Sequence, residues 1–354
     1  MRVDDFDFEV PEELIALHPA HPRSSSRMLV ADAVGNEIMG FCDLATQLMP
    51  GDLIVFNDTK VIPARIVGVR RREDSSAKIE ATLMKRLSVD SWHALVRPAK
   101  RLKVGEKIEF EGISAAVLKK HDGGGVDLMF DTEGTELDAV ISQIGSPPLP
   151  PYIAARREGS QSDVEDYQTM FAANLGAVAA PTASLHFEPP IVDEIIKKGV
   201  KIAHVTLHVG GGTFLPIKVE DTDDHVMHSE WGEVRQEAAD LINQTRLAGG
   251  RIVAAGTTAM RLLETASTEG GTIAPWVGDT DIFITPGYRF RIVDGLITNF
   301  HLPRSTLFML VSAFLGASRM QEVYSNAIKN RMRFYSYGDA SLLWRPPIHR
   351  IDSF

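Results

Sequence analysis

The sequence predicts an α/β protein: a main α/β domain with a small inserted β-barrel domain. From residue 151 onward, helical patterns alternate with short apolar strands, which is typical of α/β folds with parallel crossovers. Between residues 63 and 150, short β-rich segments follow one another, which favours a small barrel or sandwich. Residues 1–62 contain no complete core pattern. We therefore expect a discontinuous main domain, 1–62 plus 151–354, interrupted by an inserted β-barrel domain at 63–150.

Each element of the insertion follows from local pattern. Alternating or β-branched residues predict strands over 78–87, 92–96, 107–110, 114–119 and 126–130. The glycine-rich segment 121–125 predicts a hairpin loop between the last two strands. A helical pattern over 135–144 closes the insertion.

The main domain is predicted from alternating periodicities and from capping and stop signals. Helices are expected over 162–173, 191–198, 234–248, 258–266, 306–315 and 321–331. Strands are expected over 200–209, 251–255, 281–284 and 296–298.

Composition and charge narrow the class of protein. The 354 residues, 44% hydrophobic and 24% charged, are ordinary for a soluble globular protein. A net charge of −10 argues against a protein coated in basic residues to grip nucleic acid. The single cysteine, Cys42, excludes an internal disulfide framework and a cysteine-rich zinc site. No segment resembles a signal peptide or a membrane span, so we expect a cytoplasmic protein without a membrane partner.

The stretch that is richest in candidate chemistry runs from His204 to Phe214. On a strand, His204, Thr206 and His208 share one face, and three glycines follow at 210–212. Ligands of open α/β sheets bind beyond the carboxyl ends of strands, which places His208 and the glycines near a ligand. A hydrogen-bonded structural histidine beside a tight turn is the alternative.

Two histidine pairs have spacings that metal sites also use. His204 and His208 are four residues apart on an expected strand, whereas the zincin pattern needs a helix and an adjacent glutamate. His225 and His228 lie in an acidic, loop-like segment. Because no third ligand follows at a suitable spacing, we expect no metal site.

Three further segments place polar groups at strand-to-helix junctions. Thr257 and Thr258 follow a buried strand and can cap the next helix, whose free N–H groups then face an anion. Arg261 and Glu264, three residues apart, suggest a surface pair on that helix. The segments 179–187 and 298–306 contain His186 and His301, together with Thr182, Ser184, Asn299 and Arg304. Capping, turn chemistry and a satisfied core histidine are the plainer alternatives in each case.

Basic residues gather in and near the insertion, which is nearly neutral overall. Those that we single out as candidates to face a polyanion are Arg70, Arg71, Arg72, Lys100, Arg101, Lys103, Arg156 and Arg157. An ordinary solvated surface is one interpretation, and a surface that faces a polyanion is the other.

Several segments together resemble a known family. They include NDTKVIPAR (57–65), PLPPYI (148–153), AAPTASLHF (179–187), HVTLHVGGGTF (204–214), GTTAMRLLE (256–264) and VDGLITNFHLPRSTLFMLVSAF (293–314). The chain resembles, along essentially its whole length, the S-adenosylmethionine:tRNA ribosyltransferase-isomerases of queuosine biosynthesis. Two motifs depart from the family forms PTAGLHF and HVGAGTF, since Ser184 replaces a glycine and Gly211 an alanine. If the family's glycine has a positive φ, a serine at 184 would be strained. If that glycine instead leaves room for a ligand, the side chain of Ser184 would alter ligand binding.

The resemblance implies an α/β domain with an inserted barrel and a specific reaction. Family members transfer the ribosyl part of S-adenosylmethionine onto 7-aminomethyl-7-deazaguanine at the tRNA wobble position. They isomerise the sugar, giving epoxyqueuosine and releasing adenine and methionine. S-adenosylmethionine is then a co-substrate, and no permanently bound cofactor is implied.

Residue roles follow as hypotheses from the resemblance and from the chemistry that histidine supplies near neutral pH. We expect His186, His208 and His301 to include the general base and acid, without assigning which does which. We expect S-adenosylmethionine to be held by Thr182, Ser184, Gly210, Gly211, Gly212, Thr213, Thr257, Thr258 and Asn299, and tRNA by the basic residues above. We expect a monomer. An S-adenosylmethionine-dependent RNA methyltransferase and a non-catalytic RNA-binding module are the competing interpretations.

Overall fold

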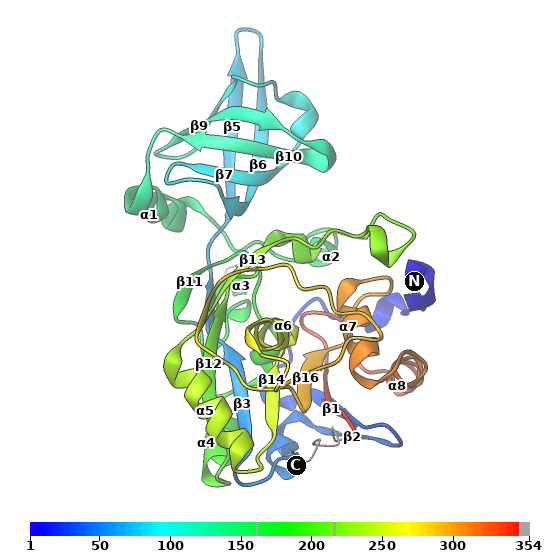
Figure 1. Ribbon diagram of the computed structural model, residues 1–354. Helices are drawn as coiled ribbons and strands as arrows, with labels where there is room; N and C mark the ends of the chain where they lie inside the picture. The colour runs from blue at the N-terminus through cyan, green and yellow to red at the C-terminus, as the bar shows by residue number, and fades with distance from the viewer. Residues whose placement is uncertain (161, 215–216, 347–354) are drawn as a thin grey trace.

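The computed structural model describes residues 1–160, 162–214 and 217–346, with the backbone only at 213 and 214. Among these residues, nine strands form one sheet in the order β15-β13-β12-β3-β14-β16-β17-β1-β2, and six others close into a barrel (Figure 1). The predicted fold class, a main α/β domain with an inserted barrel, is confirmed. No helix in the described ranges is long and apolar enough to cross a membrane.

The main sheet is mixed. The central strands β12, β3, β14 and β16 run parallel to one another, and antiparallel strands extend the sheet on both sides. Its strands are β1 (Arg27–Ala31), β2 (Asn36–Gly40), β3 (Leu53–Asn57), β12 (Lys201–Leu207), β13 (Glu230–Val234), β14 (Ile252–Ala255), β15 (Trp276–Thr280), β16 (Gly295–Asn299) and β17 (Ala340–Trp344). A separate parallel pair joins β4 (Thr59–Val61) to β11 (Asn174–Ala177).

Both faces of the sheet are buried, as the apolar runs of its central strands require. In β3, Leu53 and Val55 join one hydrophobic cluster, and Ile54 and Phe56 join another. The first cluster includes residues of α5 (Gln236–Leu247), α6 (Thr257–Ala266), α7 (Thr306–Leu315) and α8 (Ala317–Lys329). The second includes residues of α4 (Pro189–Lys197) and the 3₁₀ helix η4 (Phe41–Gln47).

The barrel closes in the order β10-β7-β6-β5-β8-β9 around its own hydrophobic cluster. Its strands are β5 (Arg65–Arg72), β6 (Ser75–Arg86), β7 (Ser91–Arg97), β8 (Lys107–Glu109), β9 (Ser114–Lys120) and β10 (Gly125–Phe130). Helix α1 (Gly134–Ile144) adds Leu137 and Ile141 to that cluster. A bridge between Arg65 and Ser146 brings together the two ends of the inserted segment. The exact division of the chain at 63 and 150 stays a prediction.

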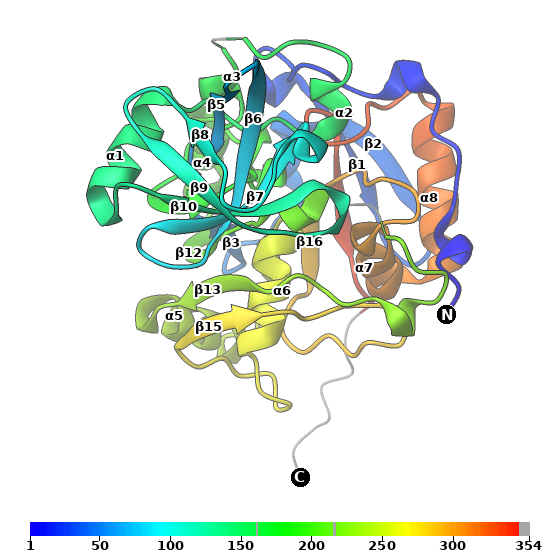
Figure 2. The same cartoon turned by 90° about the horizontal axis from the view of Figure 1, so that it is seen from above.

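The barrel stands beyond one edge of the main sheet (Figure 1), the edge at which the chain leaves β3. Seen from above, its strands overlie the part of the main domain that contains β12 and β3, whereas α7 and α8 lie to one side (Figure 2). Contact between the two parts is direct at Gly211, where a Cβ atom would clash with Met84 of β6.

Two predicted elements are wrong. The helix expected over 162–173 is only α3 (Asp163–Asp166), because Tyr167 leaves the helical region and the chain then extends into β11. The strand expected over 281–284 is absent from the described structure, since the pairing strand is β15, just before it. The first two residues of the helix expected over 234–248 also differ, because Val234 pairs in β13 and Arg235 is the N-cap. A short α2 (Pro151–Ala154) follows the proline-rich link.

Candidate active site

The carboxyl ends of the four parallel strands meet at the edge of the sheet below the barrel, and Asn57 joins three elements there. Its side-chain amide donates to the carbonyl of Leu207 at 2.9 Å and to Oγ1 of Thr258 at 3.2 Å. Its Oδ1 accepts from the backbone N–H of Leu207 at 3.0 Å. The fully buried amide therefore fixes the ends of β3 and β12 against the start of α6.

His186 lies in a buried chain of hydrogen bonds that ends at this edge. It belongs to the 3₁₀ helix η7 (Thr182–His186). Its Nδ1 lies 2.8 Å from Oγ of Ser26, and its Nε2 lies 3.2 Å from Nδ2 of Asn299. Thr182 donates to Oδ1 of Asn299 at 2.9 Å, which orients that amide with Nδ2 toward the imidazole. Burial lowers the pKa of His186 to about 4, so the ring is neutral near pH 7.

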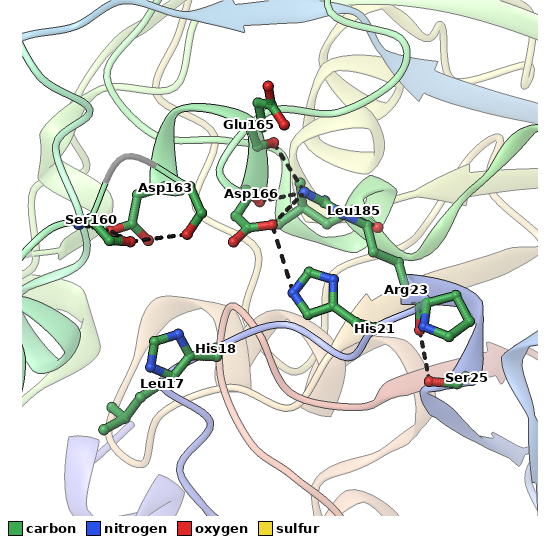
Figure 3. A network of polar contacts seen from close by, with 12 residues as sticks. Leu17, His18, His21, Arg23, Ser25, Ser160, Asp163, Glu165, Asp166 and Leu185 are labelled. Atoms are coloured by element: carbon green, nitrogen blue, oxygen red, sulfur yellow. Dashed lines mark hydrogen bonds and ion pairs between the residues drawn. The ribbon is translucent and has the colours of Figure 1, made fainter.

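Segment η7 is held in place by the N-terminal part of the chain (Figure 3). Arg23 donates to the carbonyl oxygens of Leu185 and Asp166 at 3.3 and 2.8 Å. His21 lies 4.0 Å from the same aspartate's carboxylate. The tie spans about 160 residues of sequence, so the position of His186 depends on tertiary structure.

Ser184 is buried in η7, at the position where the family form has glycine. It is not among the non-glycine residues with positive φ, so strain from a left-handed backbone does not arise. Its hydroxyl is buried without a hydrogen-bond partner among the described residues.

His208 occupies a different part of the same edge. Its Nδ1 lies 2.8 Å from Oγ1 of Thr59, and its ring stacks on Trp231 with centroids 5.0 Å apart. Gly176 approaches the ring so closely that a Cβ there would lie 2.7 Å from it. Burial lowers the pKa of His208, which favours its neutral form.

A cavity of about 450 Å³ opens beside these groups, a volume usual for a small-molecule site. Three of the predicted site residues, Gly212, Asn299 and His301, line it. His186 reaches the cavity only through Asn299. His208, Thr182, Ser184, Gly210, Gly211, Thr257 and Thr258 are not among its lining residues, and the side chain of Thr213 lies outside the described residues.

His301 lies at the wall of the cavity, two residues after the end of β16. Its Nε2 is 3.0 Å from Oγ1 of Thr298, and its backbone N–H donates to the hydroxyl of Tyr324 at 2.9 Å. Burial lowers the pKa of this imidazole to about 3. Like His186, it is therefore neutral near pH 7.

The glycine-rich loop packs tightly between the cavity and the barrel. The backbone N–H of Gly210 donates to Oε1 of Glu230 at 2.9 Å. A Cβ at Gly212 would lie 2.5 Å from the ring of His228, which also lines the cavity. Close approach therefore demands glycine at 212.

A buried ion pair at the cavity was missed by the sequence reasoning. Arg261 of α6 pairs with Glu230 of β13, and both side chains are less than a tenth exposed. The predicted surface pair of Arg261 with Glu264 is wrong, because Glu264 is itself buried and accepts from the backbone N–H groups of residues 291–293. The MHSEW segment (227–231) contains Glu230, but nothing local in the sequence links it to Arg261.

The threonines at the start of α6 make no side-chain cap. The N-cap is Gly256, whose φ of 101° suits glycine. Thr258 instead accepts the hydrogen bond from Asn57.

The predicted polyanion-binding residues form one cluster on the barrel and a separate pair. Arg70 is buried and, like Arg72, donates to the carbonyl of Arg101, so segments 70–72 and 100–103 lie side by side. Arg71 and Arg72 also pair with Glu109 and Glu106, at 2.9 and 2.5 Å.

The separate basic pair lies after α2 in the main domain. Arg157 makes two hydrogen bonds to the carboxylate of Asp163, at 2.8 and 2.6 Å, and is largely buried. Arg156 lies 3.3 Å from Glu12.

One group of possible metal ligands lies elsewhere among the described residues. His93, His121 and Asp127 of the barrel have ligand atoms within 4.8 Å of one another. Asp127 lies within hydrogen-bond distance of both imidazoles, at 2.7 and 2.8 Å, which accounts for the grouping without an ion.

Comparison with known proteins gives one consistent result. The family model described as "Queuosine biosynthesis protein" matches residues 3–343. The S-adenosylmethionine:tRNA ribosyltransferase-isomerase of Parvibaculum lavamentivorans is 56% identical over 347 residues, covering 97% of this chain and 99% of that protein. The Mesorhizobium japonicum protein of the same name is 54% identical over 357 residues, with 98% of each chain covered. The crystal structure of a Thermotoga maritima S-adenosylmethionine tRNA ribosyltransferase is 36% identical, with a TM-score of 0.55, covering 96% of this chain and 99% of that one.

Proposed function

The chain belongs to the family of queuosine biosynthesis proteins, and we propose that it is an S-adenosylmethionine:tRNA ribosyltransferase-isomerase. The observation that carries this proposal is similarity along the whole chain to relatives of that name, at more than half identity. A cavity of suitable size at the carboxyl edge of the sheet supplies a place for the nucleoside substrate.

The reaction moves the ribosyl part of S-adenosylmethionine onto the aminomethyl group of 7-aminomethyl-7-deazaguanine in the tRNA anticodon. A base removes a C5′ proton, which the adjacent sulfonium acidifies. Adenine and methionine leave, and the isomerised sugar remains on the nitrogen as epoxyqueuosine. These reactants and products balance, so the activity calls for no resident cofactor.

The three candidate histidines have lowered pKa values, so each is in the neutral form that can accept a proton but is a weaker base than a free imidazole. His301 is the one of the three that lines the cavity, so we assign it the base that acts on a bound substrate. His186 acts through Asn299, because its Nε2 lies 3.2 Å from Nδ2 of the amide that Thr182 orients. His208, the third candidate acid–base histidine, lies next to the glycine loop. Gly212 and Asn299, which line the cavity, contact S-adenosylmethionine directly. Four of the remaining residues do not line the cavity and instead support the residues that do: Thr182, Ser184, Thr257 and Thr258.

Single-turnover kinetics tests these roles. Alanine at His301 removes a group at the cavity and should slow the chemical step most. Alanine at His186 should act through the freed amide of Asn299 and be partly rescued by H186Q. Rates near that of the wild type for all three histidine variants would contradict the assignment.

Transfer RNA is proposed to dock on the barrel. Lys100 and Lys103 supply exposed cationic groups there, and Arg71 and Arg72 add theirs while paired with Glu109 and Glu106. Arg70 and Arg157 are held by internal partners and position their neighbours. Each phosphate contact contributes about −0.7 for a single strand to about −0.9 for a duplex to the slope of log affinity against log salt. The K100E/K103E variant, at two exposed lysines, should therefore flatten that slope by about 1.5–2, and an unchanged slope would argue against this surface.

Product analysis separates the proposed activity from its alternatives. The protein is incubated with S-adenosylmethionine and precursor tRNA, and the products are separated by chromatography. Free adenine and methionine are expected. A methyltransferase would give S-adenosylhomocysteine, and a non-catalytic RNA-binding module would consume nothing. We further propose a cytoplasmic monomer, which light scattering on the eluting protein tests for its oligomeric state.

A further inference from the structure

Arg261 is a buried cation at the wall of the cavity. Its Nη1 pairs with Glu230, and its Nε donates to the carbonyl of Ile282 at 3.3 Å. Its third nitrogen, Nη2, is buried and has no hydrogen-bond partner among the described residues. A guanidinium that lacks one partner in a mostly apolar setting has the capacity to bind one more acceptor.

Glu230 does not compete for that capacity. Its Oε2 faces Arg261, and its Oε1 accepts from the N–H of Gly210. The carboxylate thus anchors the guanidinium to the glycine loop and fixes its position, while both of its oxygens are engaged.

The other arginine that lines the cavity is a poorer anion site. Arg304 is nearly half exposed, and it pairs with Asp4 at 2.6 Å. Water screens its charge, which weakens the electrostatic attraction between Arg304 and an anionic ligand. Among the described lining residues, Arg261 is therefore the buried cation.

We propose that Arg261 binds the α-carboxylate of the methionyl part of S-adenosylmethionine, with Glu230 as its positioning residue. This inference rests on the proposed function, which supplies the ligand. Adenosine carries no anionic group, so the methionyl carboxylate is the part of that ligand that matches a guanidinium. Neighbouring apolar wall residues, including Ile282 and Ile284, then lie along the methionyl chain.

The test varies the ligand before it varies the protein. Calorimetry compares binding of S-adenosylmethionine with binding of its decarboxylated form, which keeps the adenosine, the sulfonium and the amine. The wild type should bind the complete molecule about 10- to 100-fold more tightly, as expected for one charge-assisted hydrogen-bonded contact. Equal affinities would overturn the carboxylate subsite, even where adenine release shows that the proposed activity holds.

Two variants test which residue causes the difference in affinity between S-adenosylmethionine and its decarboxylated form. R261Q should reduce the ratio of the two affinities to less than about threefold, whereas the matched variant R304Q should keep it within about twofold of wild type. A full ratio in R261Q would place the carboxylate elsewhere and overturn the inference. Should R261Q not fold by circular dichroism, R261K keeps a positive charge beside Glu230 but has a single nitrogen, so pairing with Glu230 leaves no second nitrogen for the ligand. Its affinity ratio should then fall clearly below that of the wild type, and an unchanged ratio would overturn the inference.

The failure of the proposed function gives a different result. A folded wild-type protein that binds neither ligand and releases no adenine would overturn the proposed function, and this subsite with it.

Discussion

The two buried histidines near the cavity should make the fold sensitive to mild acid. Burial lowers the pKa of His186 to about 4 and of His301 to about 3, from an ordinary value of 6.5. Below pH 6.5 the unfolded chain takes up protons at these rings and the folded chain does not, so the free energy of unfolding falls. This stability is complete above pH 6.5 and is lost as the pH falls toward the folded-state values. At about pH 5 each histidine accounts for a loss of about 2 kcal/mol.

Urea unfolding at pH 8 and at pH 5 measures this effect. The drop in unfolding free energy between the two pH values should be about 2 kcal/mol smaller in H301Q than in the wild type, since glutamine does not titrate. The control is H18Q, because the side chain of His18 is exposed. A drop as large in H301Q as in the wild type would refute the reasoning that burial keeps His301 neutral.

Three further variants test packing around the site. E264Q should lower the unfolding free energy by about 2–4 kcal/mol, because an amide cannot accept from all three N–H groups of the loop before β16, and urea unfolding checks this. S184A should leave that free energy unchanged or raise it by about 1 kcal/mol, since it removes a buried hydroxyl without a described partner. A loss above about 1 kcal/mol would contradict this. G212A should weaken S-adenosylmethionine binding about tenfold by calorimetry, whereas G210A, where a Cβ has ordinary room, should have little effect.

Most barrel strands were predictable because alternation of apolar and polar residues survives in them. β5 is the exception, and its inward-facing residues explain why. Ile66, Gly68 and Arg70 point toward the barrel interior, so the pattern contains one glycine and one arginine where apolar side chains are expected. Gly68 makes room for Phe110, and Arg70 bonds to the carbonyl of Arg101. Neither compensation is visible along the strand itself.

The helix that was predicted over 162–173 fails for a related reason. Asp163 looks like an ordinary first-turn residue, but its carboxylate is bound by Arg157 and by the N–H of Ser160. The following Tyr167 is buried beside Tyr337, and Asn174 then begins the strand that pairs with β4. The local pattern of residues 162–173 favours a helix, but contacts with distant parts of the chain end that helix after Asp166.

The site shows the same limit most clearly in α6. Spacing of three residues predicts that Arg261 and Glu264 meet on an exposed face, a rule that holds for helices with a solvated side. Nearly every residue of α6 is buried, so each of the two charges must find a partner from another element. Glu264 accepts hydrogen bonds from the loop before β16, and Arg261 forms an ion pair with Glu230, 31 residues earlier. Nη2 of Arg261 still has no partner among the described residues. For this reason we infer a ligand contact from α6, although the periodicity of this helix is ordinary.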